Sequence, residues 1–195
     1  MTFVGVGALL VCAYLLGSIN AALVVARARS VDIRAVGSGN PGASNVLRAM
    51  GKGPATVVYL ADLLKGWLPA VVGLAVWDAT IAGMVGLGAV IGHCYPAFHR
   101  LRGGKGVATA GGVVLALSPL VMALMIGVYA VALAVTRISA VGSLAAVLLA
   151  IPALLLAGVD SGAVGWFGVA TLLILLRHRS NLARLRAGTE NKLTR

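Results

Sequence analysis

The chain has 195 residues, of which 60% are hydrophobic and only 11% are charged, and its mean hydropathy is +1.01. Because soluble domains carry roughly a quarter charged residues, this composition excludes a soluble globular domain. The net charge of +11 indicates an anionic partner such as lipid headgroups or a phosphorylated substrate. Only 5% of residues are aromatic and none are interleaved with the basic segments, so we expect no nucleic acid among the partners.

Apolar runs of about 20 residues, the length that spans the hydrocarbon core of a bilayer, begin with the first residues of the chain. The first run, residues 2–26, has no basic segment before it and is followed by Arg27 and Arg29. It therefore does not match a signal peptide, and the preference of positive residues for the cytoplasm places its N-terminus outside. Further runs cover residues 54–77, 80–98, 106–136, 139–158 and 162–176.

The run from residue 106 to residue 136 decides the topology. As a single helix it would place Arg137 and the basic tail outside, against the tendency of Lys and Arg to stay in the cytoplasm. A break at Ser118-Pro119, where proline removes a backbone donor, returns those residues to the cytoplasm. We therefore predict an all-α integral membrane protein that forms a single domain over residues 1–195. It has seven transmembrane helices, its N-terminus outside and its C-terminus in the cytoplasm.

One of these helices, residues 106–117, is short. At ~1.5 Å per residue it would measure about 18 Å, too little to cross the membrane alone. A helix that starts below the membrane surface leaves a water-filled notch at its cytoplasmic N-terminus. Backbone N–H groups and the helix dipole attract anions to such a notch.

The first cytoplasmic connection, residues 34–48, is rich in glycine and short polar side chains. Glycines permit positive φ and close backbone approach, and Ser, Asn and Arg side chains supply hydrogen-bond donors. The stretch suits a phosphate cradle, but an ordinary loop with turn residues explains it equally well. The candidate anion-binding residues are Gly37, Ser38, Gly39, Asn40, Gly42, Ser44, Asn45, Arg48 and Lys52.

The second connection places Gly103, Gly104, Lys105 and Gly106 directly before the short helix. Glycine N–H groups and one ammonium that converge on an anion are typical of phosphate loops. The segment lacks the first glycine and the Ser or Thr of a Walker A sequence, so nucleotide hydrolysis is unsupported. A basic loop with turn glycines is the alternative. The third polar segment, the tail from His178 onward, is typical of lipid headgroup binding.

Polar residues within the helices give weaker signals. Asp62 and Lys65 are three residues apart and can pair with each other, while His93 reads as a buried structural histidine at least as well as a catalytic one. Ser139 and Ser143 stand one turn apart and can face the same cleft. Cys12 and Cys94 read as small buried hydrophobes. No metal-ligand cluster is visible, so we expect neither a metal nor a cofactor.

The three polar segments together resemble the bacterial acyl-phosphate:glycerol-3-phosphate acyltransferases of the PlsY type. The likeness covers nearly the whole chain and rests on residues 37–48, on Gly92-His93-Cys-Tyr-Pro96 leading into residues 103–106, and on residues 178–190. By that resemblance Ser38, Arg48, Lys105, His178 and Asn181 fall on active-site positions, and Ser143 on a serine of the phosphate pocket.

The resemblance implies transfer of a fatty acyl group from acyl phosphate to glycerol 3-phosphate, giving 1-acyl-glycerol 3-phosphate and phosphate in the first step of phospholipid synthesis. It implies a bacterial inner-membrane enzyme with a cytoplasmic active site, and a functional link to a soluble enzyme that forms acyl phosphate. A transporter for a phosphorylated metabolite would also need basic residues and broken helices. It fits less well, because the external half of the chain contains almost no polar residues.

Overall fold

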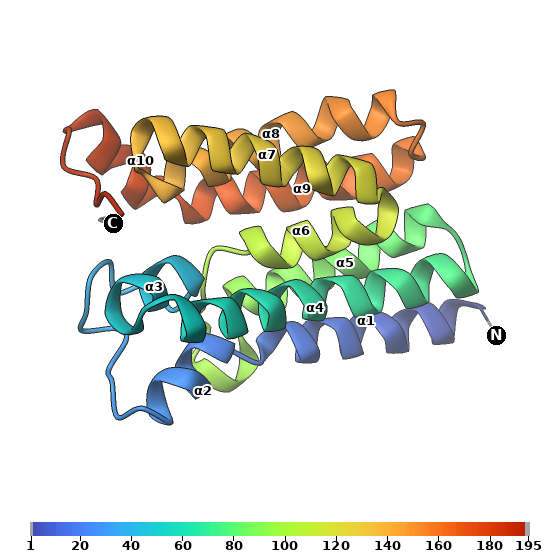
Figure 1. Cartoon of the computed structure of the whole chain (residues 1–195). Coiled ribbons are helices and arrows are strands. Elements are labelled where there is room, and N and C mark those ends of the chain that lie inside the picture. Colours follow the sequence, from blue (N-terminus) through green and yellow to red (C-terminus); the bar gives the residue numbers. More distant parts are fainter. Residues whose placement is uncertain (1, 194–195) are drawn as a thin grey trace.

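The computed structural model describes residues 2–193, and within that range every regular element is a helix. Ten α-helices and one 3-10 helix follow one another (Figure 1). The elements are α1 (Thr2–Ser18), α2 (Ala21–Arg27), α3 (Ala43–Met50), α4 (Lys52–Val76), α5 (Ala79–Cys94), η1 (Ala97–His99), α6 (Val107–Leu117), α7 (Pro119–Thr136), α8 (Ser139–Leu156), α9 (Ser161–Arg177) and α10 (Arg179–Arg186).

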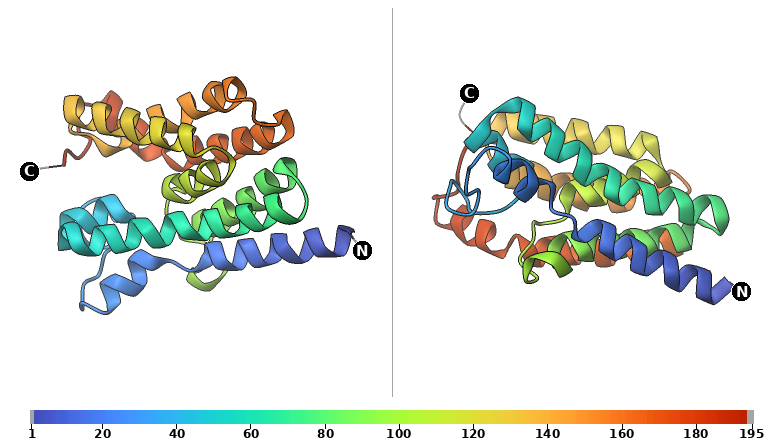
Figure 2. Two further views of the ribbon diagram at one scale, coloured as in Figure 1. Left: turned by 45° about the vertical axis from the view of Figure 1, so that its right-hand side comes forward. Right: turned by 90° about the horizontal axis from the view of Figure 1, so that it is seen from below.

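The long helices run back and forth along one common direction (Figures 1 and 2). The N-terminus lies at one end, together with the short turns that join α4 to α5, α6 to α7 and α8 to α9 (Figure 1). The short helices α2, α3 and α10 gather at the opposite end. All three polar segments of the sequence therefore lie at one end of the bundle, which we call the polar end.

Five helices are long and apolar enough to cross a membrane, and a sixth span results if α9 and α10, bent by 54°, are taken together. The predicted short helix is confirmed, since α6 has 11 residues. So is the break before Pro119, where Ser118 ends α6 and its Oγ accepts a hydrogen bond from Val121 N at 3.4 Å. The first apolar run differs from the prediction, because it breaks at Ile19-Asn20 into α1 and α2.

Close backbone contacts hold α6 on α4 and α1 on α5. A Cβ at Gly112 of α6 would lie 2.7 Å from Trp67 N, and a Cβ at Gly17 of α1 would lie 2.9 Å from the Ala89 carbonyl carbon. Only glycine allows helices to approach this closely, and such approach replaces the missing hydrophobic driving force inside a membrane. A third contact, at Gly73 of α4, where a Cβ would lie 2.9 Å from Ala82 Cα of α5, links the two pairs, so α1, α4, α5 and α6 form one tightly packed group.

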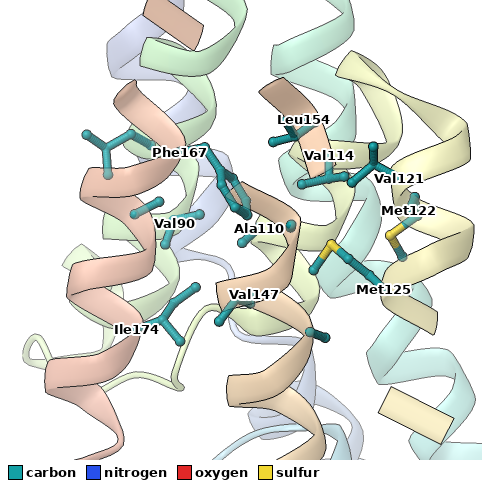
Figure 3. Close-up of a cluster of buried hydrophobic side chains, with 14 of the residues drawn as sticks. Val90, Ala110, Val114, Val121, Met122, Met125, Val147, Leu154, Phe167 and Ile174 are labelled. Carbon is teal, nitrogen blue, oxygen red and sulfur yellow. The ribbon is translucent and has the colours of Figure 1, made fainter. Parts of the chain in front are cut away.

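The largest buried cluster lies where α6, α7, α8 and α9 meet, and α4 and α5 also contribute to it, as Val90 of α5 shows in Figure 3. There α7 contributes Met122 and Met125, which fill irregular space because thioether side chains are flexible. Many outward side chains are apolar and exposed, as a lipid-facing surface requires. Cys12 belongs to that surface, so the prediction that it is buried is wrong, whereas Cys94 is buried as predicted.

Candidate functional site

A cavity of about 630 Å³ opens at the polar end of the bundle. It collects residues that are far apart in the sequence, including all five predicted catalytic residues: Ser38, Arg48, Lys105, His178 and Asn181. Five of the predicted substrate-binding residues also line it: Asn40, Gly42, Asn45, Gly106 and Ser143. The remaining four, Gly37, Gly39, Gly103 and Gly104, do not lie on its wall.

The side chain of Asn45 holds the first cytoplasmic connection, residues 34–48, by hydrogen bonds to its backbone. Its side chain is 1% exposed, its Nδ2 donates to the carbonyls of Ile33 at 3.0 Å and Val36 at 2.9 Å, and its Oδ1 accepts from Ser38 N at 3.0 Å. Gly37 has a φ of +60°, and a Cβ there would collide with the Asn45 amide. The loop thus presents Ser38 to the cavity because Asn45 holds the chain around it.

A chain of hydrogen bonds fixes Lys105 at the other side of the cavity. Lys105 Nζ donates to Asn181 Oδ1, and Asn181 Nδ2 donates to Glu190 Oε1 at 2.8 Å. The second carboxylate oxygen of Glu190 accepts from Arg184 Nε at 2.8 Å. The ammonium of the second polar segment is therefore tied to the tail, which the sequence places about 75 residues away.

The surroundings of Lys105 weaken its hold on a proton. Burial lowers the pKa of Lys105 from 10.5 to about 8, and the nearby guanidinium groups of Arg184, Arg48 and Arg177 act in the same direction against Glu190. At neutral pH the side chain is still largely protonated. A site with several cations in low-dielectric surroundings favours an anion, because the anion relieves their mutual repulsion.

His178 lies between α9 and α10 and is 2% exposed. Its Nδ1 is 2.8 Å from the carbonyl oxygen of Ile174, which can only accept, so Nδ1 carries the hydrogen and Nε2 is left with its lone pair. Burial, and then the charge of Lys105, lower the His178 pKa to about 4. The ring is thus a neutral hydrogen-bond acceptor in the empty site.

Arg48 reaches across from α3 toward the tail. Its guanidinium donates to the carbonyls of Ser44 at 3.4 Å and Asn191 at 3.3 Å, and burial lowers its pKa from the usual value. Its buried Nε has no hydrogen-bond partner among residues 2–193. A guanidinium that lines a cavity with a donor to spare is suited to bind phosphate.

The family model for glycerol-3-phosphate acyltransferase matches residues 7–188. The chain belongs to this family. A glycerol-3-phosphate acyltransferase of Pseudomonas savastanoi pv. phaseolicola is 47% identical over 91% of this chain and 93% of its own, and one of Aquifex aeolicus is 41% identical over 94% and 97%. These matches confirm the family that the three polar segments indicated.

Crystal structures of PlsY, an integral membrane glycerol 3-phosphate acyltransferase, share the fold. The glycerol 3-phosphate form superimposes with a TM-score of 0.94 at 39% identity, and the lysophosphatidic acid form with 0.92 at 38%. Each match covers 97% of this chain and 96% of the PlsY chain. The all-helical membrane fold of this family member is therefore that of PlsY.

In this acyltransferase-family chain, residues 103–106 form the loop that carries Lys105, which we call the lysine loop. Gly103 and Gly104 hold this loop in place. Their N–H groups donate to the carbonyls of Cys94 at 3.2 Å and His93 at 3.1 Å. Their own carbonyls accept from the guanidinium of Arg177 at 3.0 Å and 3.1 Å. Since those N–H groups are already bonded, the loop offers an anion the Lys105 ammonium and the first turn of α6 beyond Gly106 rather than a ring of glycine N–H groups.

Ser139 and Ser143 both line the cavity, as their spacing predicted. Ser139 Oγ is 2.7 Å from Ser44 Oγ and 2.9 Å from Tyr129 Oη, so three hydroxyls from α3, α7 and α8 form one chain. Sequence reasoning missed Tyr129, because nothing in its neighbourhood distinguishes it from other apolar residues of α7.

Glu190 was also missed as a site residue, although it is the only acidic residue of a basic tail. Its carboxylate is 9% exposed and lines the cavity, where it orients Asn181. Between residues 2 and 193 no three His, Cys, Asp or Glu side chains converge in a way that could hold a metal ion.

Proposed function

We propose that this protein transfers a fatty acyl group from acyl phosphate to the 1-hydroxyl of glycerol 3-phosphate, forming lysophosphatidic acid and phosphate. The observation that carries the proposal is the lining of the cavity. It combines the cations Lys105 and Arg48 with apolar side chains from α4, α6, α7 and α8. Two phosphorylated groups and one fatty chain need such a division.

The chemistry suits this donor. An acyl phosphate is an activated mixed anhydride, so the enzyme needs no covalent nucleophile; it must align the hydroxyl, stabilise the developing oxyanion and hold the departing phosphate. The His-x4-Asp pair of other acyltransferases is missing from the chain. That motif has Asp five residues after the histidine. The residues at this position after His93, His99 and His178 are Phe98, Gly104 and Ala183, so none of them is Asp.

We assign Lys105 and Arg48 to the substrate phosphates, where their charges offset those of the donor and acceptor. Ser38 and Asn181 would position oxygen atoms by hydrogen bonds, and Ser143 would complete the phosphate pocket. The glycines of both loops would contribute by allowing the backbone to pass close to the bound substrates. The C–O bond to the acceptor hydroxyl forms as the bond between the carbonyl carbon and the phosphate oxygen breaks.

The proton of the glycerol hydroxyl needs an acceptor. His178 at a pKa of about 4 is a weak base in the empty site, although its Nε2 can accept a hydrogen bond from the hydroxyl and orient it. A phosphate monoester has its second pKa near 6, roughly two units higher. We therefore favour a substrate phosphate as the base, with His178 as the group that orients the hydroxyl. If the base is the phosphate of acyl phosphate, it leaves with the proton. If the base is the phosphate of glycerol 3-phosphate, it stays in the product and passes the proton to water.

The charge distribution supports an orientation with the N-terminus outside and residues 27–53, 99–105 and 177–195 in the cytoplasm, across seven spans of which α6 is the short one. In this orientation the site of a single domain, residues 1–195, would lie at the cytoplasmic face of a bacterial inner membrane. There it would meet membrane lipid and the product of a soluble enzyme that forms acyl phosphate. Single cysteines at Thr2 and Ala187, without Cys12 and Cys94, test it: a membrane-impermeant maleimide should label only residue 2 in intact cells.

The donor test uses purified protein and radiolabelled glycerol 3-phosphate. Lysophosphatidic acid should form with acyl phosphate, with or without a metal chelator, and not with acyl-CoA alone. Efficient turnover with acyl-CoA would refute the proposed donor. No acyl transfer with either donor, in protein that keeps a cooperative thermal transition, would refute the proposed function itself.

A further inference from the structure

A second polar cluster, formed by Asp62 and Lys65 of α4 and His93 of α5, is buried at the wall of the cavity, which Asp62 and His93 line. The three side chains are 3–5% exposed. Asp62 Oδ1 lies 2.9 Å from Lys65 Nζ and 3.5 Å from His93 Nδ1. Burial of charged groups within helices is expensive, and apolar residues of similar volume would pack α4 on α5 at least as well. The cluster therefore needs a reason other than helix packing.

Lys65 connects the cluster to the break in the first apolar run. Its Nζ donates to the carbonyl oxygen of Ile19 at 2.9 Å, where the chain passes from α1 to α2. A carbonyl at a helix break lacks its usual partner, and the lysine supplies one. On this side the cluster fixes where α2 leaves the bundle.

His93 connects the cluster to the lysine loop. Its carbonyl accepts from Gly104 N at 3.1 Å, and Gly104 also lies against the imidazole ring. A Cβ on Gly104 would lie 2.9 Å from Cε1 and 3.0 Å from Cδ2 of that ring, and closer still to Nε2. The ring and the carbonyl of one residue thus form the surface on which the residue before Lys105 rests.

The same contacts give His93 a supporting position at the cavity wall, which its side chain helps to line. Nδ1 faces Asp62, and Gly104 lies against the Nε2 side of the ring. The residue it supports most directly is Lys105, one position beyond Gly104. Arg177 holds the loop from the other side through the carbonyls of Gly103 and Gly104.

We propose that Asp62, Lys65 and His93 act as positioning residues for Lys105: the cluster fixes the His93 ring, and the ring fixes the loop that carries the ammonium. The inference rests on the proposed function insofar as it assigns Lys105 to a substrate phosphate. A displacement of about 1 Å can reduce an enzyme's rate about 10²-fold, so a shift of this loop should be visible in kcat.

The first readout does not need turnover. Acetylation by N-hydroxysulfosuccinimidyl acetate is followed by mass spectrometry at Lys105 and at Lys192 of the same molecule, an exposed lysine that does not line the cavity. In His93→Ala and Asp62→Asn the Lys105 rate should change at least about threefold while the Lys192 rate stays constant. Thr171→Val, which alters a buried polar residue of α9 away from the cavity, is the matched control and should change neither rate.

The second readout separates action through Lys105 from action by His93 itself. His93→Ala should lower kcat about 10- to 100-fold in the wild-type background, but less than about threefold in a Lys105→Met background, because the residue it positions is gone. Effects that multiply in the double variant would overturn the proposal, as would an unchanged Lys105 acetylation rate in a His93 variant that has lost activity.

Gly104→Ala covers the case in which the His93 variants fail to fold. Its new methyl group meets the His93 ring and should push the loop and the ring apart while Asp62 and Lys65 are unchanged in sequence, and Lys105 acetylation should change as in the His93 variants. In His93→Ala/Gly104→Ala the methyl has room, so activity should exceed that of Gly104→Ala. A Gly104→Ala protein with native Lys105 acetylation would contradict the proposal. If wild-type protein shows no acyl transfer, the proposed function fails while the acetylation result stands.

Discussion

Replacement of Lys105 by methionine tests the centre of the proposed site. Methionine keeps the length and apolar stem of lysine but removes the ammonium that donates to Asn181. Hydrogen bonds to charged groups contribute about 1.5 to 3 kcal/mol, which corresponds to roughly 10- to 150-fold in rate. Loss of one donor to a developing oxyanion lowers the rate about 10²- to 10³-fold. We therefore expect kcat/KM to fall by about two orders of magnitude.

The same substitution should not destabilise the protein. The folded state holds the Lys105 proton less tightly than the unfolded chain, since burial lowers the pKa to about 8. The unfavourable contribution of the charged group is therefore complete below about pH 8 and disappears as the pH rises toward 10.5. At pH 7 an apolar side chain avoids it, and this gain opposes the cost of leaving the buried Asn181 Oδ1 without its donor, so the midpoint of thermal unfolding in detergent should stay close to that of the wild type.

The assay measures lysophosphatidic acid formed from radiolabelled glycerol 3-phosphate at several concentrations, with the melting temperature of each variant beside it. Arg100→Ala is the matched control, because Arg100 is an exposed cation of the same loop that does not line the cavity. Lys105→Arg should recover little, since a planar guanidinium cannot replace a compact ammonium next to Gly104 and Gly106. Near wild-type turnover by well-folded Lys105→Met at low glycerol 3-phosphate would refute the reasoning.

Three further outcomes follow from the geometry. Because the empty-site pKa of Lys105 is about 8, KM for glycerol 3-phosphate should rise from pH 8 to pH 10 as the ammonium loses its proton, and Lys105→Met should lose this dependence when initial rates are compared. Glu190→Gln leaves one of two donors, Asn181 or Arg184, without a carboxylate oxygen, so stability should fall by about 1–3 kcal/mol and activity with it, as measured by thermal unfolding and acyl transfer. Asn45→Ala removes three hydrogen bonds that hold the first loop, and should lower the melting temperature and raise KM, whereas unchanged values would show that the loop is held by other contacts.

The sequence predicted the features that local patterns determine. Proline after Ser118 marked the end of α6, and the positions of Lys and Arg gathered the three polar segments at one end of the bundle. The break between α1 and α2 was missed because its local signals, Gly17 in the last turn of α1 and Asn20 as the N-cap of α2, stand inside a continuous apolar run. Its exposed carbonyl is satisfied by Lys65, 46 residues away, which is a tertiary contact.

The division of labour within the site was also beyond the sequence. Asn45 and Gly104 are residue types that commonly bind anions. In this structure, however, the Asn45 amide and the Gly104 N–H group both donate to backbone carbonyls of the protein. Whether a glycine N–H or an asparagine amide is free for a ligand depends on which carbonyl the fold brings beside it. Glu190 illustrates the reverse case, since its partners become apparent only once the tail folds back over Lys105.

The two sides of the cavity differ in how firmly they are built. The side formed by α4 and α6 rests on backbone contacts such as the one at Gly112, which leave no side chain to rearrange. The side formed by α7 meets the core through Met122 and Met125, whose thioethers change rotamer at little expense. One wall is thus stiff and the other compliant, so under the proposed function a fatty chain would be accommodated by adjustment of α7 while Lys105 stays in place.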